Sequence, residues 1–420
     1  TSAWPILASY QSWRRPLAQR SRRNAILLFD PRTHKTIGAT AAVLLAATLG
    51  PVPRSVEAQN RPQPPLVFAA QPETALPAPP PCPEGPPLAP PEVKAASAIL
   101  VDAVTGTVLW EKDAHTRRPN ASTTKIMTAT LILESGRLDD IVTFSPKARA
   151  TPYANLNAKP GEKFKARDLL YAIMLRSSND SCVAMAEHLC GEAWKFAAQM
   201  TQRARSLGAV NTNFVTTNGL YDKNHYSTAY DLALMTRYAI RFPLFNEVVS
   251  TQSTLIERTV NQEDRLIRNH NKFLKKYQGA DGVKTGYVRQ SGRCLVASAT
   301  GLEDGQPWRL ITVVLNSPDT YGDSARMMDW GRKHFQPVYF ARRGESVGSV
   351  AVSQGTASRV PVVAADDLMA IVRREPGSNR PYREIHTTSR LAAPVKQDQV
   401  AGKVIALVDG KKVAEVDLRA

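Results

Sequence analysis

Three short segments of the chain combine hydroxyl, amine and amide side chains at spacings that suit acyl transfer. The first is Ser122-Thr-Thr-Lys125, which opens an apolar helical run. A spacing of three places the serine and the lysine on one helix face, one turn apart. A serine hydroxyl is a poor nucleophile until a base removes its proton, and a lysine with a pKa lowered by desolvation can be that base. Taken alone, the pair also suits an N-capping serine beside a surface lysine.

The second segment, Ser177-Ser-Asn179, lies between two apolar helical stretches, so we expect a loop of fixed geometry. A serine here can relay a proton, and an asparagine can hold a peptide carbonyl or orient a lysine. The competing interpretation is a capping cluster for the next helix, since Ser and Asn are both favoured caps.

The third segment, Lys284-Thr-Gly-Tyr287, enters a predicted edge strand. An ammonium and a hydroxyl side by side suit a carboxylate, and Gly286 permits a ligand to approach the backbone closely. Taken alone, the segment also suits a turn flanked by a solvated lysine.

Together the three segments resemble the S-x-x-K, S-D-N and K-T-G motifs shared by β-lactamases and penicillin-binding proteins. Their order and their separations of 55 and 107 residues recur in that superfamily. Longer stretches are similar to the D-alanyl-D-alanine carboxypeptidase branch of the low-molecular-mass penicillin-binding proteins, namely residues 119–127, 176–180, 218–232 and 279–287. The resemblance covers roughly residues 94–420, because the C-terminal part is similar to the β-domain that follows the catalytic domain there.

The resemblance implies a serine-type D-Ala-D-Ala carboxypeptidase that removes the terminal D-alanine from peptidoglycan stem peptides and binds β-lactam antibiotics covalently. It implies Ser122 as the nucleophile, Lys125 as its base and Ser177 as the group that passes a proton to the leaving nitrogen. Backbone N–H groups of Ser122 and Tyr287 would form the oxyanion hole. The implied substrate-binding residues are Asn179, Lys284, Thr285, Gly286 and Tyr287. We expect no metal and no cofactor, since His225 has no ligand partner at metal-binding spacing and suits a structural role.

Two departures from the family pattern stand out. Members often carry a carboxylate-binding arginine before the closing helix, but residues 317–323 contain none, and Arg289 or Arg326 could substitute. Many members also end in an amphipathic membrane helix, which we do not expect here.

Three other functions fit parts of the pattern. A β-lactamase needs a deacylating glutamate shortly after the second motif, but no Glu occurs between Glu192 and Glu247. A DD-transpeptidase would use the same acyl-enzyme with another acceptor. A non-catalytic cell-wall binding protein could keep the fold, although the nucleophile, base and relay positions are all filled.

The elements around these motifs predict an α+β fold, a DD-peptidase/β-lactamase-like domain with helices packed on an antiparallel sheet. Apolar spacing predicts two strands within residues 98–110, helices over 125–133, 169–174 and 182–189, strands over 294–298 and 309–315, and a closing helix near 327–331. A small all-β domain follows. It has alternating runs at 347–352, 359–363 and 404–418 and a tight hairpin at Asp409-Gly410.

Composition sets the limits of the remaining organisation. A hydrophobic share of 43% excludes a wholly disordered chain, and four cysteines in 420 residues exclude a disulfide scaffold. The net charge of +17 comes without a nucleic-acid motif, so we expect no nucleic-acid partner.

We expect four parts along the chain. Residues 1–58 form a basic leader and export signal, with an uncharged run at 37–50 and small residues before Gln59 that suit signal-peptide cleavage. Residues 59–92 are a proline-rich linker, since fifteen prolines lie between Pro51 and Pro91. The catalytic domain spans 93–339 and the β-domain 340–420. The protein is expected to be exported and periplasmic, or tethered to the inner membrane by an uncleaved N-terminal segment.

Overall fold

The computed structural model describes residues 79–374 and 380–420. The predicted export signal and most of the predicted linker lie outside these residues. The described end of the linker, residues 79–92, has no helix or strand, as expected for a stretch in which proline removes backbone donors.

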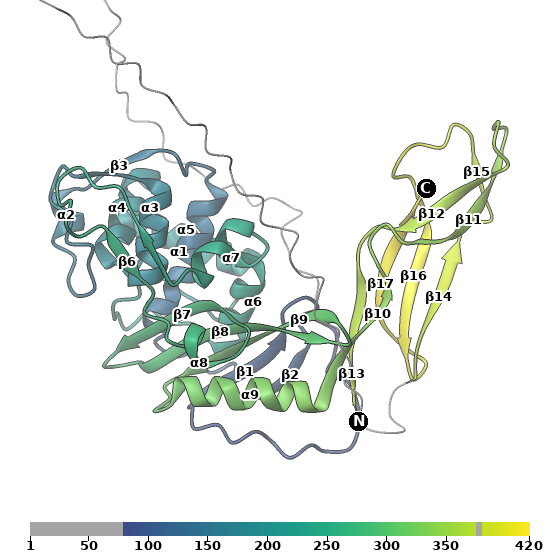
Figure 1. Cartoon of the computed structure of the whole chain (residues 1–420), viewed down its shortest axis with the longest axis horizontal. Coiled ribbons are helices and arrows are strands. Elements are labelled where there is room, and N and C mark those ends of the chain that lie inside the picture. Colours follow the sequence, from purple (N-terminus) through teal and green to yellow (C-terminus); the bar gives the residue numbers. More distant parts are fainter. Residues whose placement is uncertain (1–78, 375–379) are drawn as a thin grey trace, which may run out of the picture. The chain divides into compact units, whose positions relative to one another are not determined.

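A five-stranded antiparallel sheet forms the centre of the predicted catalytic domain (Figure 1). Its strand order is β2-β1-β9-β8-β7, so β7 lies at one edge, as the third motif predicted. The strands are β1 (Ser97–Asp102), β2 (Val108–Lys112), β7 (Ala280–Val288), β8 (Gly292–Glu303) and β9 (Gln306–Leu315).

Helices cover both faces of this sheet. In chain order they are the 3-10 turn η2 (Ala121–Thr124), α1 (Lys125–Glu134), α2 (Pro146–Arg149), α3 (Ala166–Tyr171), the π-helical turn η3 (Ala172–Arg176), α4 (Asn179–Cys190), α5 (Ala193–Ser206), α6 (Ala229–Ala239), α7 (Pro243–Ser250), α8 (Phe273–Lys276) and α9 (Thr320–His334). Two small two-stranded sheets lie among the helices. One is made of β3 (Ile141–Thr143) and β4 (Lys163–Lys165), and the other of β5 (Ser253–Leu255) and β6 (Leu266–Arg268).

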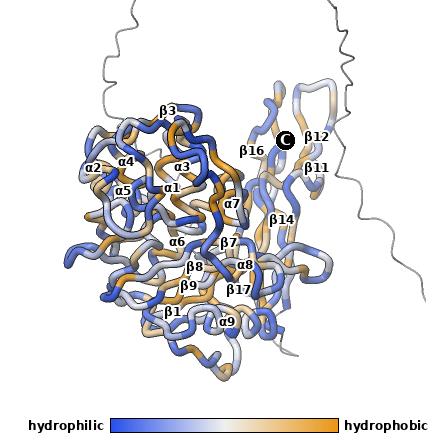
Figure 2. The backbone as a smooth tube through the Cα atoms, turned by 60° about the vertical axis from the view of Figure 1, so that its left-hand side comes forward, coloured by the Kyte–Doolittle hydropathy of each residue, from blue (hydrophilic) through white to orange (hydrophobic). Residues whose placement is uncertain are grey.

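Alternation along the strands divides the core in two. On β9, Ile311 and Val313 pack into the core formed by the helices α1 and α3–α7. Their neighbours Leu310 and Val314 point to the opposite face, where they pack with Met327 of α9. Phe273 of α8 packs into the same cluster. Figure 1 shows α9 running along this face of the sheet, and Figure 2 shows the apolar segments gathered between sheet and helices. The predicted α+β architecture is therefore confirmed.

The C-terminal part is all β, as predicted. A six-stranded sheet has the order β14-β16-β17-β12-β11-β15, and β10 pairs with β13. The bounds are β10 (Phe335–Ala341), β11 (Ser346–Ser353), β12 (Arg359–Ala364), β13 (Leu368–Arg373), β14 (Pro381–Thr387), β15 (Arg390–Ala392), β16 (Val400–Val408) and β17 (Lys411–Arg419). The hairpin between β16 and β17 turns at Asp409 and Gly410, both at positive φ, as a type I′ turn requires. Strand β10 spans the boundary that we expected near residue 340.

The length and polarity of the helices bear on whether any of them could span a membrane. Over residues 79–374 and 380–420, each of them is too short or too polar to cross a bilayer.

Candidate active site

The first motif forms a tight turn that leads directly into a buried helix. Ser122 lies in η2, and α1 begins at Lys125, whose side chain is completely buried. Lys125 Nζ lies 2.9 Å from Ser122 Oγ. The same nitrogen donates to Asn179 Oδ1 at 2.8 Å and to the backbone oxygen of Asn218 at 2.7 Å. The three protons of an ammonium therefore have three acceptors, and one of these acceptors is the serine.

Burial changes the acidity of this lysine. Desolvation lowers the pKa of Lys125 to about 8, and the nearby Cys182 and Asp180 oppose the shift. A lysine with this pKa is partly neutral near neutral pH, so its nitrogen can accept a proton from the adjacent hydroxyl.

The second motif is held in an unusual backbone conformation at the junction of η3 and α4. Ser177 has φ +66°, in the left-handed region that is unfavourable for residues other than glycine. Its hydroxyl has no hydrogen-bond partner among the described residues and is available to a ligand. Asn179 Nδ2 donates to Pro152 O at 3.0 Å, which orients its amide oxygen toward Lys125. The expected loop of fixed geometry is present, and Ser178 occupies the N-cap position without a side-chain cap bond.

The third motif brings β7 against the serine turn. A methyl group at Gly286 would lie 3.1 Å from the backbone nitrogen of Ser122 and 3.2 Å from Ala121 Cβ. A methyl group here would therefore be a tight contact, and the turn would have to shift by a few tenths of an ångström to accept it. The side chain of Tyr287 is exposed, so the expected contribution of this residue is its backbone N–H.

Lys284 is a second buried lysine next to the first. Its ammonium donates to Thr285 O at 3.0 Å. Desolvation lowers the pKa of Lys284 to about 7, and the positive charge of Lys125 contributes to the lowering. The two amines therefore compete for protons in one low-dielectric site. All three motifs, predicted from distant parts of the sequence, lie together.

Asn218 and Gly219 also belong to the site, and neither was predicted as a site residue. The Asn218 contribution is a backbone oxygen, which has no sequence signature. Gly219 has φ +85°, and a methyl group there would lie 1.9 Å from Ala121 O. This Asn-Gly turn supports η2 directly, and it begins the stretch 218–232 that resembles the family.

His225 braces the same turn, which fits the structural role expected for it. Its Nδ1 accepts hydrogen bonds from the backbone nitrogens of Val215 and Thr216, so the ring proton lies on Nε2. Nε2 then donates to Thr124 Oγ1 at 2.8 Å. Desolvation lowers the pKa of His225 to about 4, which keeps the ring neutral. Within the described ranges, no group of His, Cys, Asp or Glu could hold a metal ion.

The two arginines considered as carboxylate ligands differ in their surroundings. Arg326 is paired with Asp319 and Asp323 and donates to Glu92 O, so its guanidinium is already engaged. Arg289 is exposed just beyond the end of β7.

Comparisons with known proteins agree with this geometry. Residues 86–319 match the D-alanyl-D-alanine carboxypeptidase family model, and residues 335–420 match the C-terminal domain of penicillin-binding protein 5. D-alanyl-D-alanine carboxypeptidase DacF of Bacillus subtilis is 30% identical over 330 residues, covering 77% of this chain and 84% of the relative.

Solved structures give the same result. Penicillin-binding protein 5 from Haemophilus influenzae superposes with a TM-score of 0.65 at 30% identity, over 79% of this chain and 98% of that one. A serine-to-alanine mutant of Streptomyces K15 DD-transpeptidase has a TM-score of 0.54 at 32% identity, over 58% of this chain and 99% of that one. The chain therefore belongs to the D-alanyl-D-alanine carboxypeptidase family of low-molecular-mass penicillin-binding proteins, with a peptidase domain followed by the C-terminal β-domain.

Proposed function

We propose that this D-Ala-D-Ala carboxypeptidase removes the terminal D-alanine of peptidoglycan stem peptides through an acyl-enzyme on Ser122, and that penicillin acylates the same oxygen. The observation that carries the proposal is the 2.9 Å contact between Ser122 Oγ and the fully buried Lys125 Nζ.

The first chemical step follows from that contact. Ser122 Oγ attacks the carbonyl between the two D-alanines while neutral Lys125 takes its proton. The negative charge that develops on the carbonyl oxygen is stabilised by the backbone N–H groups of Ser122 and Tyr287. An oxyanion-hole donor of this kind contributes about 3 kcal/mol to catalysis.

The second step releases D-alanine. Ser177 passes a proton to the departing nitrogen, and the carbon–nitrogen bond breaks to leave an ester on Ser122. Asn179 holds the substrate amide while it also fixes Lys125 through its own oxygen. Water then attacks the ester, the serine recovers its proton and the shortened peptide leaves.

Lys284 and Thr285 bind the terminal carboxylate in this scheme, with Gly286 giving room for the peptide along β7. An incoming carboxylate favours the protonated form of Lys284. Because the two amines repel each other, that charge keeps Lys125 neutral. Substrate binding would in this way leave the proton on the carboxylate-binding lysine and free the base.

Labelling with a fluorescent penicillin tests the nucleophile. We expect the wild-type chain to label, Ser122→Ala to remain unlabelled and Ser145→Ala to label normally. Ser145 is a matched control because its hydroxyl caps α2 and donates to Glu187, outside the site. A folded wild-type protein that fails to label would overturn the proposal and favour the non-catalytic binding protein.

Product analysis separates the remaining alternatives. We expect the protein to release D-alanine from a pentapeptide. We also expect mass spectrometry to find one penicillin molecule bound covalently to the protein. Formation of a new peptide bond to an added amine would instead indicate a transpeptidase, the activity named for the K15 protein. Rapid steady-state hydrolysis of penicillin would indicate a β-lactamase.

The part of the chain before the catalytic domain supports export. We propose that residues 1–58 direct the chain across the inner membrane, that residues 59–92 are a spacer, and that 93–339 and 340–420 are the catalytic and β-domains. The basic leader, its uncharged run and the small residues before Gln59 support this assignment. An uncleaved leader would tether the protein to the inner membrane.

A further inference from the structure

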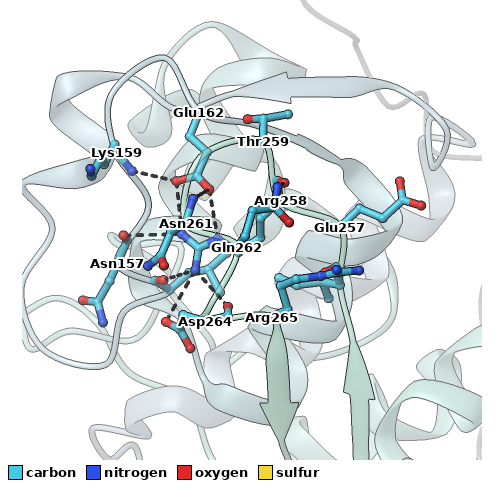
Figure 3. Close-up of polar contacts among 12 residues, drawn as sticks. Asn157, Lys159, Glu162, Glu257, Arg258, Thr259, Asn261, Gln262, Asp264 and Arg265 are labelled. Carbon is cyan, nitrogen blue, oxygen red and sulfur yellow. Dashed lines mark hydrogen bonds and ion pairs between the residues drawn. The ribbon is translucent and has the colours of Figure 1, made fainter.

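Arg258 lies in a buried polar cluster that neither the motifs nor the proposed mechanism uses (Figure 3). The side chains of Arg258 and Glu162 are both fully buried and form a two-bond ion pair, with Nε to Oε1 at 2.9 Å and Nη2 to Oε2 at 3.1 Å. Glu162 also accepts from the backbone nitrogens of Lys159 and Asn261. Removing two charges from water is costly, so a pair buried this completely must be satisfied by several further bonds.

The guanidinium of Arg258 also donates hydrogen bonds to backbone oxygens. Nη1 donates to Leu156 O at 3.1 Å and to Asp264 O at 3.0 Å, and Nη2 reaches Asn157 O at 3.5 Å. Figure 3 shows these bonds converging on Arg258 from chain segments on different sides. One side chain therefore fixes the loop around residues 156–157 to the loop around residue 264.

The first of these loops is also the support of the second catalytic motif. Asn179 N donates to Ala154 O at 2.7 Å, and Asn179 Nδ2 donates to Pro152 O. Leu156 N donates to both carboxylate oxygens of Asp180, at 2.9 and 3.0 Å. Leu156 thus presents its carbonyl to Arg258 and its amide to the residue next to Asn179.

A second connection reaches the same motif from its other end. Asp264 Oδ2 lies 3.4 Å from Arg258 Nη1, and Asp264 Oδ1 lies 2.8 Å from Arg176 Nη1. Arg176 is the residue immediately before Ser177, whose left-handed backbone needs support from its surroundings.

We propose that Arg258, together with Glu162 and Asp264, is the positioning centre that holds Ser177 and Asn179 in the geometry needed to acylate Ser122. Arg258 acts through the 152–157 loop and through Arg176 and is not itself a catalytic residue. The inference rests on the proposed function, because it names the residues that position the side chains of the same site.

The test compares full-length Arg258→Met with Arg203→Met. Arg203 is the matched control because it is also largely buried, and because its ion pair with Glu134 joins α5 to α1, away from the 152–157 loop. Penicillin concentration is varied to separate initial binding from the limiting acylation rate, at a temperature where each variant is folded. Displacing a reacting group by about 1 Å can slow a reaction up to a hundredfold.

We expect Arg258→Met to lower the limiting acylation rate about tenfold or more with a smaller effect on initial binding, and Arg203→Met to stay within about twofold of wild type. Asp264→Asn removes the negative charge between Arg258 and Arg176 but leaves the bonds of Arg258 to the 152–157 loop, so it should give an intermediate loss. It carries the test if Arg258→Met does not fold. Hydrogen exchange should become faster in residues 152–158 and 176–180 in the Arg258 and Asp264 variants only.

Two results would overturn the inference. One is a wild-type acylation rate with unchanged exchange in both segments, and the other is an equal loss in Arg203→Met. Failure of the proposed function has a separate signature, since the wild-type chain would then not label, while the exchange measurement would still report on the two segments.

Discussion

Lys125 and Lys284 are two buried amines in one site, and catalysis needs the first to be neutral and the second to be protonated. Burial lowers the pKa of Lys125 to about 8, and the pKa of Lys284 falls to about 7 by burial and repulsion from Lys125. The nucleophile needs a neutral neighbour, whereas a carboxylate needs a charged one. This conflict is resolved when the charge of the ligand selects which lysine is protonated.

The pH dependence of acylation tests this division. We predict that the limiting rate of acylation by bound penicillin rises with pH with a midpoint near 8, because Lys125 is the base and must lose its proton, whereas binding of the penicillin carboxylate weakens as Lys284 becomes neutral. Lys284→Gln should move the midpoint to higher pH, since a neutral side chain no longer repels the Lys125 ammonium. Stopped-flow acylation between pH 5 and pH 10, as a rough working range, gives both curves. An unchanged midpoint in the variant would show that the two lysines are not coupled.

Gly286 offers a test of the close approach between β7 and the serine turn. We predict that Gly286→Ala slows acylation about tenfold or more, because its methyl group would press on the backbone nitrogen of Ser122, one of the two proposed oxyanion donors. Gly286 is not at positive φ, so the melting temperature should change little. Acylation kinetics and thermal unfolding separate the two effects, and a wild-type rate would contradict the assigned oxyanion hole.

At the scale of elements, the segment 212–228 supports η2 through a histidine that stays neutral. Because folding lowers the pKa of His225 from 6.5 to about 4, the unfolded chain binds a proton more readily between those values. We predict that the wild-type protein loses stability as pH falls from about 6.5 toward 4, and that His225→Gln shows a weaker loss. Urea unfolding at several pH values measures it, with the exposed His115 replaced by Gln as control. If the free energy of unfolding fell equally steeply with pH in the wild type and in His225→Gln, the role of His225 would be contradicted.

The sequence predicted those elements that have a clear period. The alternating strands β11, β12, β16 and β17 and the apolar helices α1 and α4 lie where their patterns indicated. Other elements have no such pattern. All six residues of β13 are buried, and all seven residues of β14 are exposed, so neither strand alternates.

In the site, the motif side chains could be predicted from the sequence, whereas the backbone contribution of Asn218 could not. The motif residues could be found because hydroxyl, amine and amide groups at fixed spacing carry chemistry. The Asn218 carbonyl could not be found because every residue has one. Arg258 was missed because its partner Glu162 lies 96 residues away, and no local pattern links two charges at that distance.

At the scale of the whole molecule, the proposed export segment would decide where the site works. Residues 1–58 carry eight Lys or Arg against two acidic residues, and the uncharged run at 37–50 is shorter than the roughly 20 residues of a membrane-spanning helix. A positively charged region before a short apolar run and small residues is the pattern of a cleaved secretory signal. The substrate lies outside the cytoplasmic membrane, so the proposed function requires this export.

Cleavage can be tested by the mass of the exported protein. We predict that the protein recovered from the periplasm without detergent begins at Gln59, because signal peptidase requires small residues before the cut, as Val56-Glu-Ala58 supplies. Ala58→Arg should block cleavage, since a large charged side chain does not fit that position, and the protein should then keep its leader and remain with the membrane fraction. Penicillin labelling of both forms shows that each is folded. A wild-type protein that retains the leader in the membrane fraction would instead establish the tethered form, and an unexported protein would contradict both.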